Sequence, residues 1–454
     1  MKKNLFLAAA AVAMLASCSQ NDLEAPVVAE AQQTAIEFGT YLGKTPASRA
    51  GLAGPMNDTQ LRLADASGGG FGLFAYHTDN DVYSSSAKPD FMWNQGVFYN
   101  DGTSKWEYTP VKYWPNETST TNNEQQGSYS AAGIDRVTFF AYAPYVTAAE
   151  VAADNTKGIT AISPNNQAGD PKISYTVATD QDDAVDLLWG VIPDTNTEWP
   201  NVTGTPMTSA TNPAFNTGFP YLDLLKPEKD QLVELSFRHA LAKLTVGVQV
   251  VNDQVDPTSS TLDNVNTKIF IKSITITSKT TDGFGTSGVL NLNNNTSKVP
   301  RWESPVSNLP TVLTADESGE IADALFWADP TDESTRTTQF AKTGATQALL
   351  NIASGATPAT TDTGWMVVPT NTKNDFTVNI DYFVMTKDEN LELGYSIVEN
   401  NIKKDVSVAA PGFVGGLNYQ IKLLLGLTSV KVNASVFDWA DGEEVEVDLP
   451  MNVD

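Results

Sequence analysis

The chain has 454 residues, of which 54 are acidic and 28 are basic, so its formal net charge is −26. A protein that binds nucleic acid needs a cationic surface against the phosphates, and this charge argues against such a partner. One Cys and two His residues provide neither an internal disulfide nor the ligand set of a Cys/His zinc site. We therefore expect no metal site and no cofactor.

The N-terminus has the pattern of a lipoprotein signal peptide over residues 1–17. Two lysines precede an apolar run at residues 5–15, which is too short to span a membrane as a helix. The run ends in Leu-Ala-Ser-Cys18, which resembles the bacterial lipobox, where the signal is cut before a lipidated Cys. We predict that Cys18 carries acyl chains such as palmitate. The alternative is an ordinary signal peptide with an incidental Cys.

Strand patterns dominate the rest of the chain. Apolar and polar residues alternate with period two and include many β-branched and aromatic residues, as in strands with one buried face. The strongest patterns cover residues 232–237, 244–250, 269–276, 376–382, 419–423 and 430–436. Residues 147–153 and 317–325 have the pattern of short helices. This distribution predicts an all-β protein made of antiparallel β-sandwiches.

A polar, turn-forming segment at residues 226–230 divides the chain. Aromatic motifs are frequent before this segment, and clean alternating strands are frequent after it. We therefore predict two β-sandwich domains in tandem, with the second domain at residues 231–454.

Several motifs along nearly the whole chain resemble those of the Bacteroidetes fimbrillins, the FimA-like and Mfa-like subunits of type V pili. They are the lipobox, residues 35–41, Ser-Arg-Ala at 48–50, and the segments 108–115, 137–145, 236–244, 365–369 and 436–439. The resemblance implies two transthyretin-like β-sandwich domains, which agrees with the strand pattern. It also implies a structural subunit of a fimbria that supports cell adhesion or biofilm formation, and not an enzyme.

The resemblance further implies a maturation step. A lipoprotein precursor reaches the outer membrane, a trypsin-like protease cuts after an Arg, and the first strand then leaves an apolar groove that a strand of a neighbouring subunit fills. The expected partners are other fimbrial subunits in a homo- or hetero-polymer, the outer membrane through the lipid on Cys18 before processing, the protease, and a host or bacterial surface receptor. The expected location is the outer membrane and then the cell surface or fimbrium.

A removable strand is predicted within a propeptide or tether at residues 18–49. This segment contains an alternating stretch whose residues on one face are Ile36, Phe38, Thr40 and Leu42.

Arg49 follows this stretch among small residues that leave the peptide bond accessible to a protease. We predict cleavage between Arg49 and Ala50, so that the first domain covers residues 50–230. The equally weighted alternative is that Arg49 is an ordinary surface residue. Arg62 is a weaker candidate because it stands between two leucines.

Two alternating stretches near the C-terminus are candidates for the donated strand. The first contains Val430, Val432, Ala434 and Val436, and the second contains Val445, Val447 and Leu449. Burial of about four such side chains contributes roughly 6–12 kcal/mol before the ordering costs. We assign the first stretch to the second domain and keep the second as the candidate donor strand, although it too can belong to the domain.

The remaining candidate sites have structural explanations. No Ser or Cys partner accompanies His239, so we predict a structural role for it and no catalytic residues in the chain. Trp106, Tyr108, Tyr113 and Trp114 can stack on a sugar, although aromatic residues more often pack in cores. The alternative function is therefore a surface-anchored, glycan-binding lipoprotein that keeps its lipid.

Overall fold

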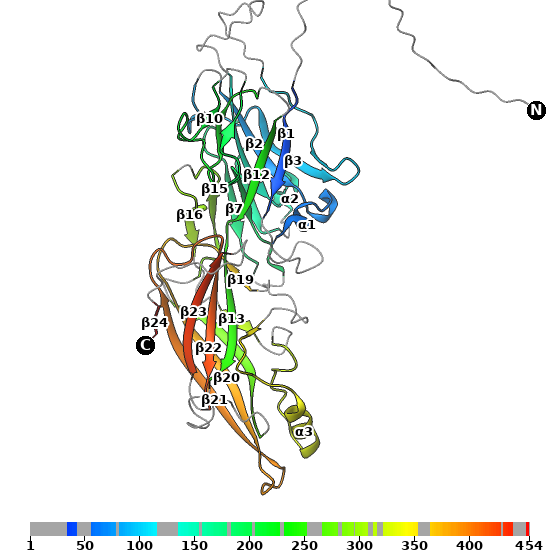
Figure 1. Cartoon of the computed structure of the whole chain (residues 1–454), viewed down its shortest axis with the longest axis vertical. Helices are drawn as coiled ribbons and strands as arrows, with labels where there is room; N and C mark the ends of the chain where they lie inside the picture. The colour runs from blue at the N-terminus through cyan, green and yellow to red at the C-terminus, as the bar shows by residue number, and fades with distance from the viewer. Residues whose placement is uncertain are drawn as a thin grey trace, which may run out of the picture.

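A computed structural model describes residues 34–42, 56–78, 81–115, 135–153, 157–178, 183–201, 205–227, 231–251, 266–279, 284–294, 296–306, 312–315, 321–352, 364–427, 430–438 and 451–453. The molecule is elongated, with strands of the first half of the chain at one end and strands of the second half at the other (Figure 1). Strands predominate, which confirms the predicted all-β fold class. No helix in these residues is long and apolar enough to cross a membrane.

The elements follow one another along the chain as a long series of strands. The first strands are β1 (Glu37–Tyr41), β2 (Phe71–Thr78), β3 (Met92–Asn100), β4 (Lys105–Glu107), β5 (Arg136–Ala143), β6 (Ile159–Ile162), β7 (Lys172–Thr176), β8 (Leu188–Val191), β9 (Glu198–Trp199), β10 (Met207–Thr208), β11 (Tyr221–Leu224) and β12 (Leu232–His239). The later strands are β13 (Ala242–Val250), β14 (Thr267–Ser278), β15 (Ser287–Asn291), β16 (Arg301–Val306), β17 (Val312–Ala315), β18 (Leu350–Ile352), β19 (Trp365–Val367), β20 (Asn374–Lys387), β21 (Tyr395–Val408), β22 (Leu417–Leu425), β23 (Val430–Asp438) and β24 (Met451–Val453). The helical elements are α1 (Asp58–Leu61), η1 (Asp65–Ser67), α2 (Ala148–Ala152) and α3 (Glu333–Ala341).

The strands of the first half form a sheet that closes on itself. The strand order is β11-β5-β2-β3-β4-β1-β12-β8, and β8 also pairs with β5. β1 completes this ring because it lies between β4 and β12. The core of the ring contains Phe38, Phe71, Phe139 and Leu235, all of which are buried.

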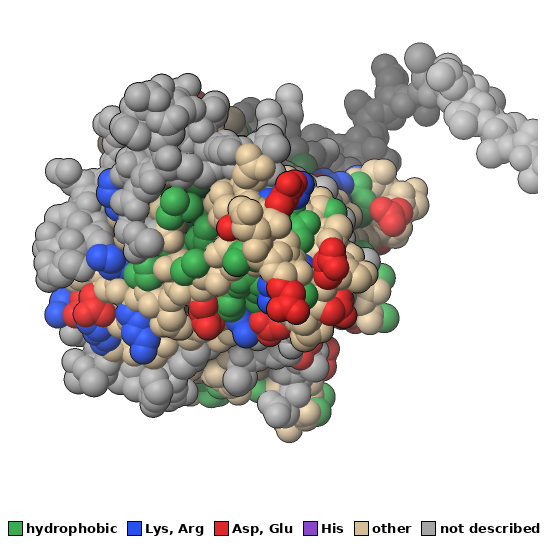
Figure 2. All heavy atoms as spheres, turned by 90° about the horizontal axis from the view of Figure 1, so that it is seen from below, with side chains coloured by type: hydrophobic (Ala, Val, Ile, Leu, Met, Phe, Trp, Pro, Cys, Tyr) green, Lys and Arg blue, Asp and Glu red, His purple; other side chains and the backbone are tan. Residues whose placement is uncertain are grey.

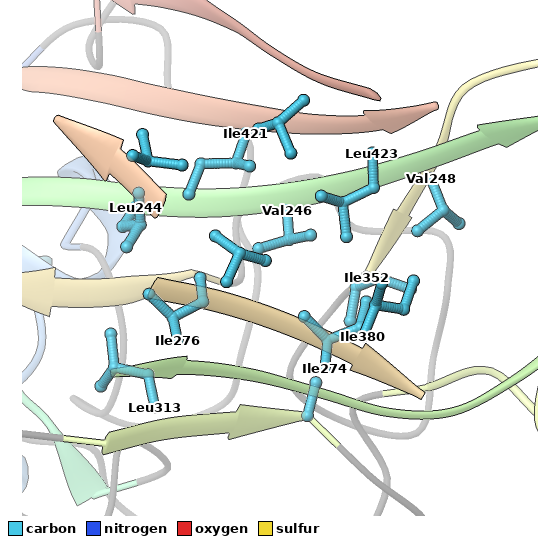
Figure 3. Packing of buried hydrophobic residues seen from close by; sticks show 14 of the residues in the cluster. Leu244, Val246, Val248, Ile274, Ile276, Leu313, Ile352, Ile380, Ile421 and Leu423 are labelled. Atoms are coloured by element: carbon cyan, nitrogen blue, oxygen red, sulfur yellow. The ribbon is translucent and has the colours of Figure 1, made fainter. Parts of the chain in front are cut away.

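The second half forms two sheets that face each other across an aliphatic core. One sheet has the order β18-β13-β22-β23, and the other has the order β17-β14-β20-β21-β24. Figure 3 shows Val246 and Ile421 of the first sheet beside Ile276 and Ile380 of the second. The alternation of buried and more exposed residues along β20 matches the period of two seen in the sequence.

A further sheet joins segments from both halves of the chain. Its order is β16-β15-β7-β6, so two strands that precede β12 pair with a hairpin that follows β13. Trp302 of β16 packs edge-on against Tyr175 of β7, and its indole N–H donates to the carbonyl of Ala240 at 2.8 Å. The two ends of the molecule are therefore connected by backbone pairing and not only by the covalent chain.

The six strongest strand patterns all lie in strands, and α2 confirms the helix expected at residues 147–153. The helix expected at 317–325 is wrong for its described residues, 321–325, which form a bend and a turn. This segment is hydrogen-bonded to β14 instead. The amide of Ile271 donates to the carbonyl of Leu325, and the amide of Trp327 donates to the carbonyl of Ile271. Tertiary hydrogen bonds have replaced the local helical ones.

Two strand pairs depart from the antiparallel arrangement that the sequence predicted. Among the pairings of the described strands, β1–β12 and β13–β22 run parallel, and the others run antiparallel. β12 begins directly after the predicted domain boundary but pairs within the sheet of the first half. The division into domains at residues 230 and 231 stays a prediction.

Acidic and basic side chains share the surface at the end of the molecule that carries α3. Figure 2 shows both kinds on this face, with apolar side chains between them. Some of the acidic and basic side chains form ion pairs, for example Lys272 with Asp329 at 3.1 Å and Lys342 with Asp323 at 2.8 Å. Pairs as exposed as these contribute little to stability.

A polar cluster around Asp170 stabilises the sheet that joins the two halves. One carboxylate oxygen accepts from the hydroxyl of Tyr83 and from the carboxamide of Asn293, each at 2.9 Å. The other oxygen accepts from the carboxamide of Asn291 at 3.3 Å. Both asparagines are buried. The carboxamide of Asn291 also donates to Glu303 at 3.0 Å, so the donor that depends most on Asp170 for an acceptor is that of Asn293.

We expect Asp170→Ala to lower the free energy of unfolding by about 2–4 kcal/mol, because it leaves buried donors unpaired. The exposed partner of Lys342 provides a matched control, since Asp323→Ala removes a carboxylate that is 88% exposed. That control is expected to change stability by less than about 1 kcal/mol. Urea unfolding of both variants measures the difference, and equal effects would contradict the assigned role of Asp170.

Candidate functional site

Strand β1 lies in a slot between two strands that come from later parts of the chain. It pairs in parallel with β12, from Glu37 opposite Leu232 to Tyr41 opposite Ser236. On its other side, Phe38 pairs with Trp106 of β4 in the antiparallel sense. We call the place that β1 fills between β4 and β12 the β1 slot.

Apolar side chains on one face of β1 are buried in the core of the ring. Ile36, Phe38 and Leu42 are at most 3% exposed. The ring of Phe38 makes edge-on contacts with Phe71 and Phe139, with centroids 6.1 and 5.9 Å apart. Burial of three such side chains contributes roughly 5–9 kcal/mol before the ordering costs, so an empty slot exposes a strongly apolar surface.

The N-terminal side of β1 is held by the half-buried phenol of Tyr108. The hydroxyl of Tyr108 donates to the carbonyl of Ile36 at 2.9 Å, and the amide of Ile36 donates to Lys112 at 2.9 Å. Burial raises the pKa of Tyr108 to about 12, so the phenol remains a neutral donor at physiological pH. These bonds position β1 without involving its core-facing side chains.

Thr40 is a defect in the packing of β1. It lies on the face that the sequence predicted to be apolar, and its hydroxyl is buried without a hydrogen-bond partner in the described structure. A buried hydroxyl in this state destabilises a fold by about 1–3 kcal/mol. An apolar side chain at this position would avoid that cost.

A cavity of about 810 Å³ begins where β1 ends, and we call it the end cavity. Its lining includes residues 39–41 of β1, residues 236–239 of β12, loop residues 193–195, 298–300 and 414–416, and Leu417 at the start of β22. The loop before β22 approaches closely because Gly415 has no side chain: a Cβ there would lie 2.4 Å from the carbonyl oxygen of Ala240. The end cavity thus continues the β1 slot along the edge of β12.

The structure describes only some of the residues singled out in the sequence. Ile36, Phe38, Thr40 and Leu42 come together in and beside the β1 slot. Cys18, Arg49 and Ala50, and the candidate donor residues Val445, Val447 and Leu449, lie outside the described residues.

Arg62, the weaker cleavage candidate, is part of a folded helix end. It is the C-terminal cap of α1, it pairs with Asp58 at 2.7 Å, and its guanidinium lies 4.4 Å from the ring centroid of Tyr99. A protease needs an extended, accessible peptide, so this position is a poorer substrate than an unstructured loop.

Near the C-terminus, β23 pairs along its whole length with β22, and Val430, Val432 and Val436 are buried in the core of the second half. This agrees with the assignment of residues 430–436 to the protein's own fold. β24 follows as a three-residue strand at the sheet edge, where it pairs with the end of β21.

His239 is buried beside Asp186, with 2.5 Å between its Nδ1 and the carboxylate. The same carboxylate accepts the backbone amides of Met56 at 3.1 Å and Leu187 at 2.8 Å. The group joins three chain segments and is buried, which agrees with the structural role predicted for His239. In the part of the chain that the structure describes, no group of His, Cys, Asp and Glu is arranged to hold a metal ion.

The aromatic residues considered for sugar stacking are mainly core residues. Trp106 and Trp114 are 8% and 2% exposed and pack against Phe71 and Phe139. Tyr113 is 44% exposed, so it does not form a stacking platform together with the two tryptophans.

Sequence reasoning missed strand β4, the pairing of β12 with β1, the end cavity and the partner of His239. The period-two pattern at residues 232–237 did indicate β12 as a strand. Its pairing with β1 has no local signal, because the two strands are far apart in sequence. The Tyr108-Thr-Pro motif, which directly follows β4, was the one sequence signal near that strand that pointed to a defined structure.

The structure defines an all-β protein whose first sheet is completed by a strand from near its N-terminus. No protein-family model matches the chain. The chain is 23% identical to the fimbrium subunit Fim1C of Phocaeicola vulgatus, over 99% of this chain and 100% of that protein. Its fold is also that of a fimbrial protein from Bacteroides vulgatus, with a TM-score of 0.54 and 20% identity over 89% of this chain and 99% of that one. These similarities confirm the resemblance to the Bacteroidetes fimbrillins.

Two substitutions in β1 are expected to act in opposite directions. Phe38→Ala removes the aromatic contacts in the slot and is expected to lower the free energy of unfolding by about 3–5 kcal/mol. Thr40→Val keeps the shape but removes the unpaired hydroxyl, and is expected to leave stability unchanged or raise it by up to about 2 kcal/mol. Denaturant unfolding together with hydrogen exchange of the β1 amides measures both effects. A strong loss of stability in Thr40→Val contradicts the description of Thr40 as a packing defect.

Proposed function

We propose that this protein is a structural subunit of a type V fimbria, exported as a lipoprotein and polymerised by strand exchange at the β1 slot. One observation carries the proposal: β1 completes the first sheet, yet it precedes Arg49 in the chain. A single cut after Arg49 removes the covalent link between β1 and the strands that surround it. The slot then becomes available to another strand.

The comparisons support this function at the level of the family. The related protein from Phocaeicola vulgatus is named a fimbrium subunit, and its similarity extends over the full length of both chains. A fimbrial subunit functions at the cell surface and associates with other subunits. We place this chain in the same setting, where it supports cell adhesion or biofilm formation through a host or bacterial surface receptor.

Export begins with the signal peptide at residues 1–17 and lipidation of Cys18. Each buried methylene of the acyl chains contributes about 0.8 kcal/mol, so two or more chains hold the precursor at the outer membrane. A trypsin-like protease then cuts between Arg49 and Ala50. Processing separates the lipid and β1 from the subunit in a single step, and leaves domains at residues 50–230 and 231–454.

Polymerisation follows from the apolar character of the vacated slot. Phe71 and Phe139 line it, and their rings lose contact with Phe38 when β1 leaves. A donated strand restores this cover and pairs with the edge of β12, which is β-strand addition. The proposed donor is the C-terminal stretch with Val445, Val447 and Leu449, whose spacing places three apolar side chains on one face.

The position of β24 is compatible with donation. β24 pairs with β21 over three residues, from Val406 opposite Val453 to Val408 opposite Met451. A strand of three residues at a sheet edge makes few backbone hydrogen bonds. It can therefore detach from β21 without disrupting the two sheets of the second half.

The variant Arg49→Ala tests the processing step. It is expected to leave a larger precursor that retains its lipidated Cys18 and residues 18–49, and that does not polymerise. Arg62→Ala is the matched control, because Arg62 lies in a folded helix end and its loss is expected to leave processing intact. Intact-mass analysis of the surface protein and ladders on unheated gels measure processing and assembly.

Fibres formed by Arg49→Ala would contradict processing at this bond. Retention of the lipid by the wild-type surface protein would favour an anchored, glycan-binding lipoprotein instead.

A truncation tests the donor strand. Removal of the residues after Trp439 is expected to leave a folded, soluble monomer, because β23 ends at Asp438 and the core residues that the structure describes all precede that point. The truncated subunit is expected to accept a strand from a wild-type subunit but not to donate one. Mixing the two proteins and resolving the products on unheated gels checks this, and ladders built from truncated subunits alone place the donor elsewhere.

A further inference from the structure

The hairpin of β20 and β21 has a strand edge that no described strand covers. β20 pairs with one side of β21 along its whole length, but β24 pairs with the other side at residues 406–408 alone. We call the part of this side at residues 395–405 the open edge. The chain is described without a break over residues 364–427, so both ends of the open edge continue into described residues. Figure 1 shows the turn of the hairpin beyond the other strands, at the lower end of the molecule.

The open edge is electrically balanced, unlike the chain as a whole. Two acidic residues, Glu399 and Asp405, balance two basic ones, Lys403 and Lys404, so its net charge is zero in a chain with a net charge of −26. Like charges on an edge strand oppose its pairing with another strand, and a balanced edge has no such net repulsion. The open edge also carries Val398, which is 49% exposed although it lies opposite the core residue Val384.

We propose that the open edge pairs antiparallel with the open edge of a second copy of this chain, with Asn400 on the two-fold axis. Tyr395 then lies opposite Asp405 of the second copy, and the two five-stranded sheets that contain β21 become one continuous sheet. A contact around a two-fold axis uses the same surface on both copies, so that surface has to be complementary to itself. The interface goes beyond the proposed function and does not involve the β1 slot.

The two ends of the open edge limit the register. β21 begins at Tyr395, directly after the turn, and β24 lies opposite Val406. A shift that puts Asn401 on the axis places the first residues of the second β21 where β24 lies. A shift that puts Glu399 on the axis shortens the pairing and sets this carboxylate against its own copy, which is unfavourable. The register centred on Asn400 is therefore the longest one that avoids both conflicts.

The side chains in this register complement one another on both faces of the sheet. On the core side, Val398 lies opposite Ile402 of the second copy, and Ile402 packs against the core of its own sandwich. On the outer side, Glu399 lies opposite Asn401 and diagonal to Lys403 of the second copy. Two-fold symmetry makes each of these contacts twice. Apolar pairs and opposite charges across neighbouring strands both stabilise a sheet.

Antiparallel pairing joins two molecules that point in opposite directions. A single strand pair is a small interface, so isolated subunits bind each other weakly. Repetition of the contact along a polymer raises the total strength by multivalency. For the fimbria proposed above, the open edges therefore link fibres that run in opposite directions, as fibres from two facing cells do.

Three single-cysteine variants test the register. Cys18→Ser removes the one Cys of the sequence, and Glu399→Cys, Asn400→Cys or Asn401→Cys then introduces a new thiol in the full chain. Each new thiol faces its own copy in one register only. Directly opposite residues have Cα atoms about 4.5–5.5 Å apart, within disulfide range, whereas diagonal neighbours are about 7–8 Å apart.

Asn400→Cys is expected to give at least about tenfold more covalent dimer than the other two single variants, in an oxidised glutathione buffer and on non-reducing gels. The carboxamide of Asn400 donates to the carbonyl of Leu427 at 3.2 Å, so its loss can weaken the fold. The double variant Glu399→Cys/Asn401→Cys reports the same register from exposed positions. Thr337→Cys, exposed on α3, measures dimers formed by random collision.

A second pair of variants tests the association without a covalent bond. Val398→Lys removes both apolar pairs and brings a charge next to Lys404 of the second copy, so it is expected to weaken self-association about tenfold in sedimentation equilibrium. Leu391→Lys is the matched control. It is 43% exposed and lies in the turn outside the open edge, so it is expected to leave self-association unchanged.

Several results overturn the inference. Covalent dimers from Asn400→Cys and from the double variant that do not exceed those from Thr337→Cys exclude this pairing, and a preference for Glu399→Cys or Asn401→Cys excludes its register. Self-association that Val398→Lys leaves intact lies at another surface. Protection of the open-edge amides from hydrogen exchange in dilute monomer shows that the chain itself covers this edge. None of these results bears on cleavage at Arg49 or on exchange at the β1 slot, so the proposed function is tested separately.

Discussion

The organisation of the first half of this protein depends on one requirement: the apolar slot between β4 and β12 has to be filled. The parallel pairing with β12 and the burial of Phe38 satisfy this requirement in the intact chain. Without an occupant, the ring of strands is open and aromatic side chains such as Phe71 face water. Any strand with suitable spacing and small enough side chains can meet the same requirement, and this interchangeability is the physical basis of assembly by strand addition.

The occupant present in the intact chain is not optimised for stability. Thr40 buries a hydroxyl without a partner, and the end cavity remains next to Tyr41. An apolar side chain at the position of Thr40 would avoid the cost of its buried hydroxyl, which bears on the strand exchange proposed above. The buried pair of His239 and Asp186 lies outside the β1 slot, and its hydrogen bond does not involve β1.

Much of the fold was predictable from the sequence because period-two patterns report directly on burial. The strands from β12 to β23 with the clearest alternation were all recognised, and the apolar face of Ile36 and Phe38 was correctly expected to be buried. Pairing partners were not predictable, because β1 meets β4 and β12 through contacts between distant segments. Helix α3 was missed because its sequence is polar, and its stability comes from the Asp332 capping box and from contacts of Phe340 with Tyr395. The end cavity has no sequence signature, since segments far apart in the sequence line it.

The sheet of β6, β7, β15 and β16 has a mechanical consequence. It draws two strands from each half of the chain, and Trp302 and the cluster around Asp170 pack across it. Tension applied to one end of the elongated molecule therefore reaches the other end through a hydrogen-bonded ladder and a buried polar cluster, acting together. A filament of such units stretches as a series of stiff rods, whereas a single flexible linker between the halves would make every subunit a hinge.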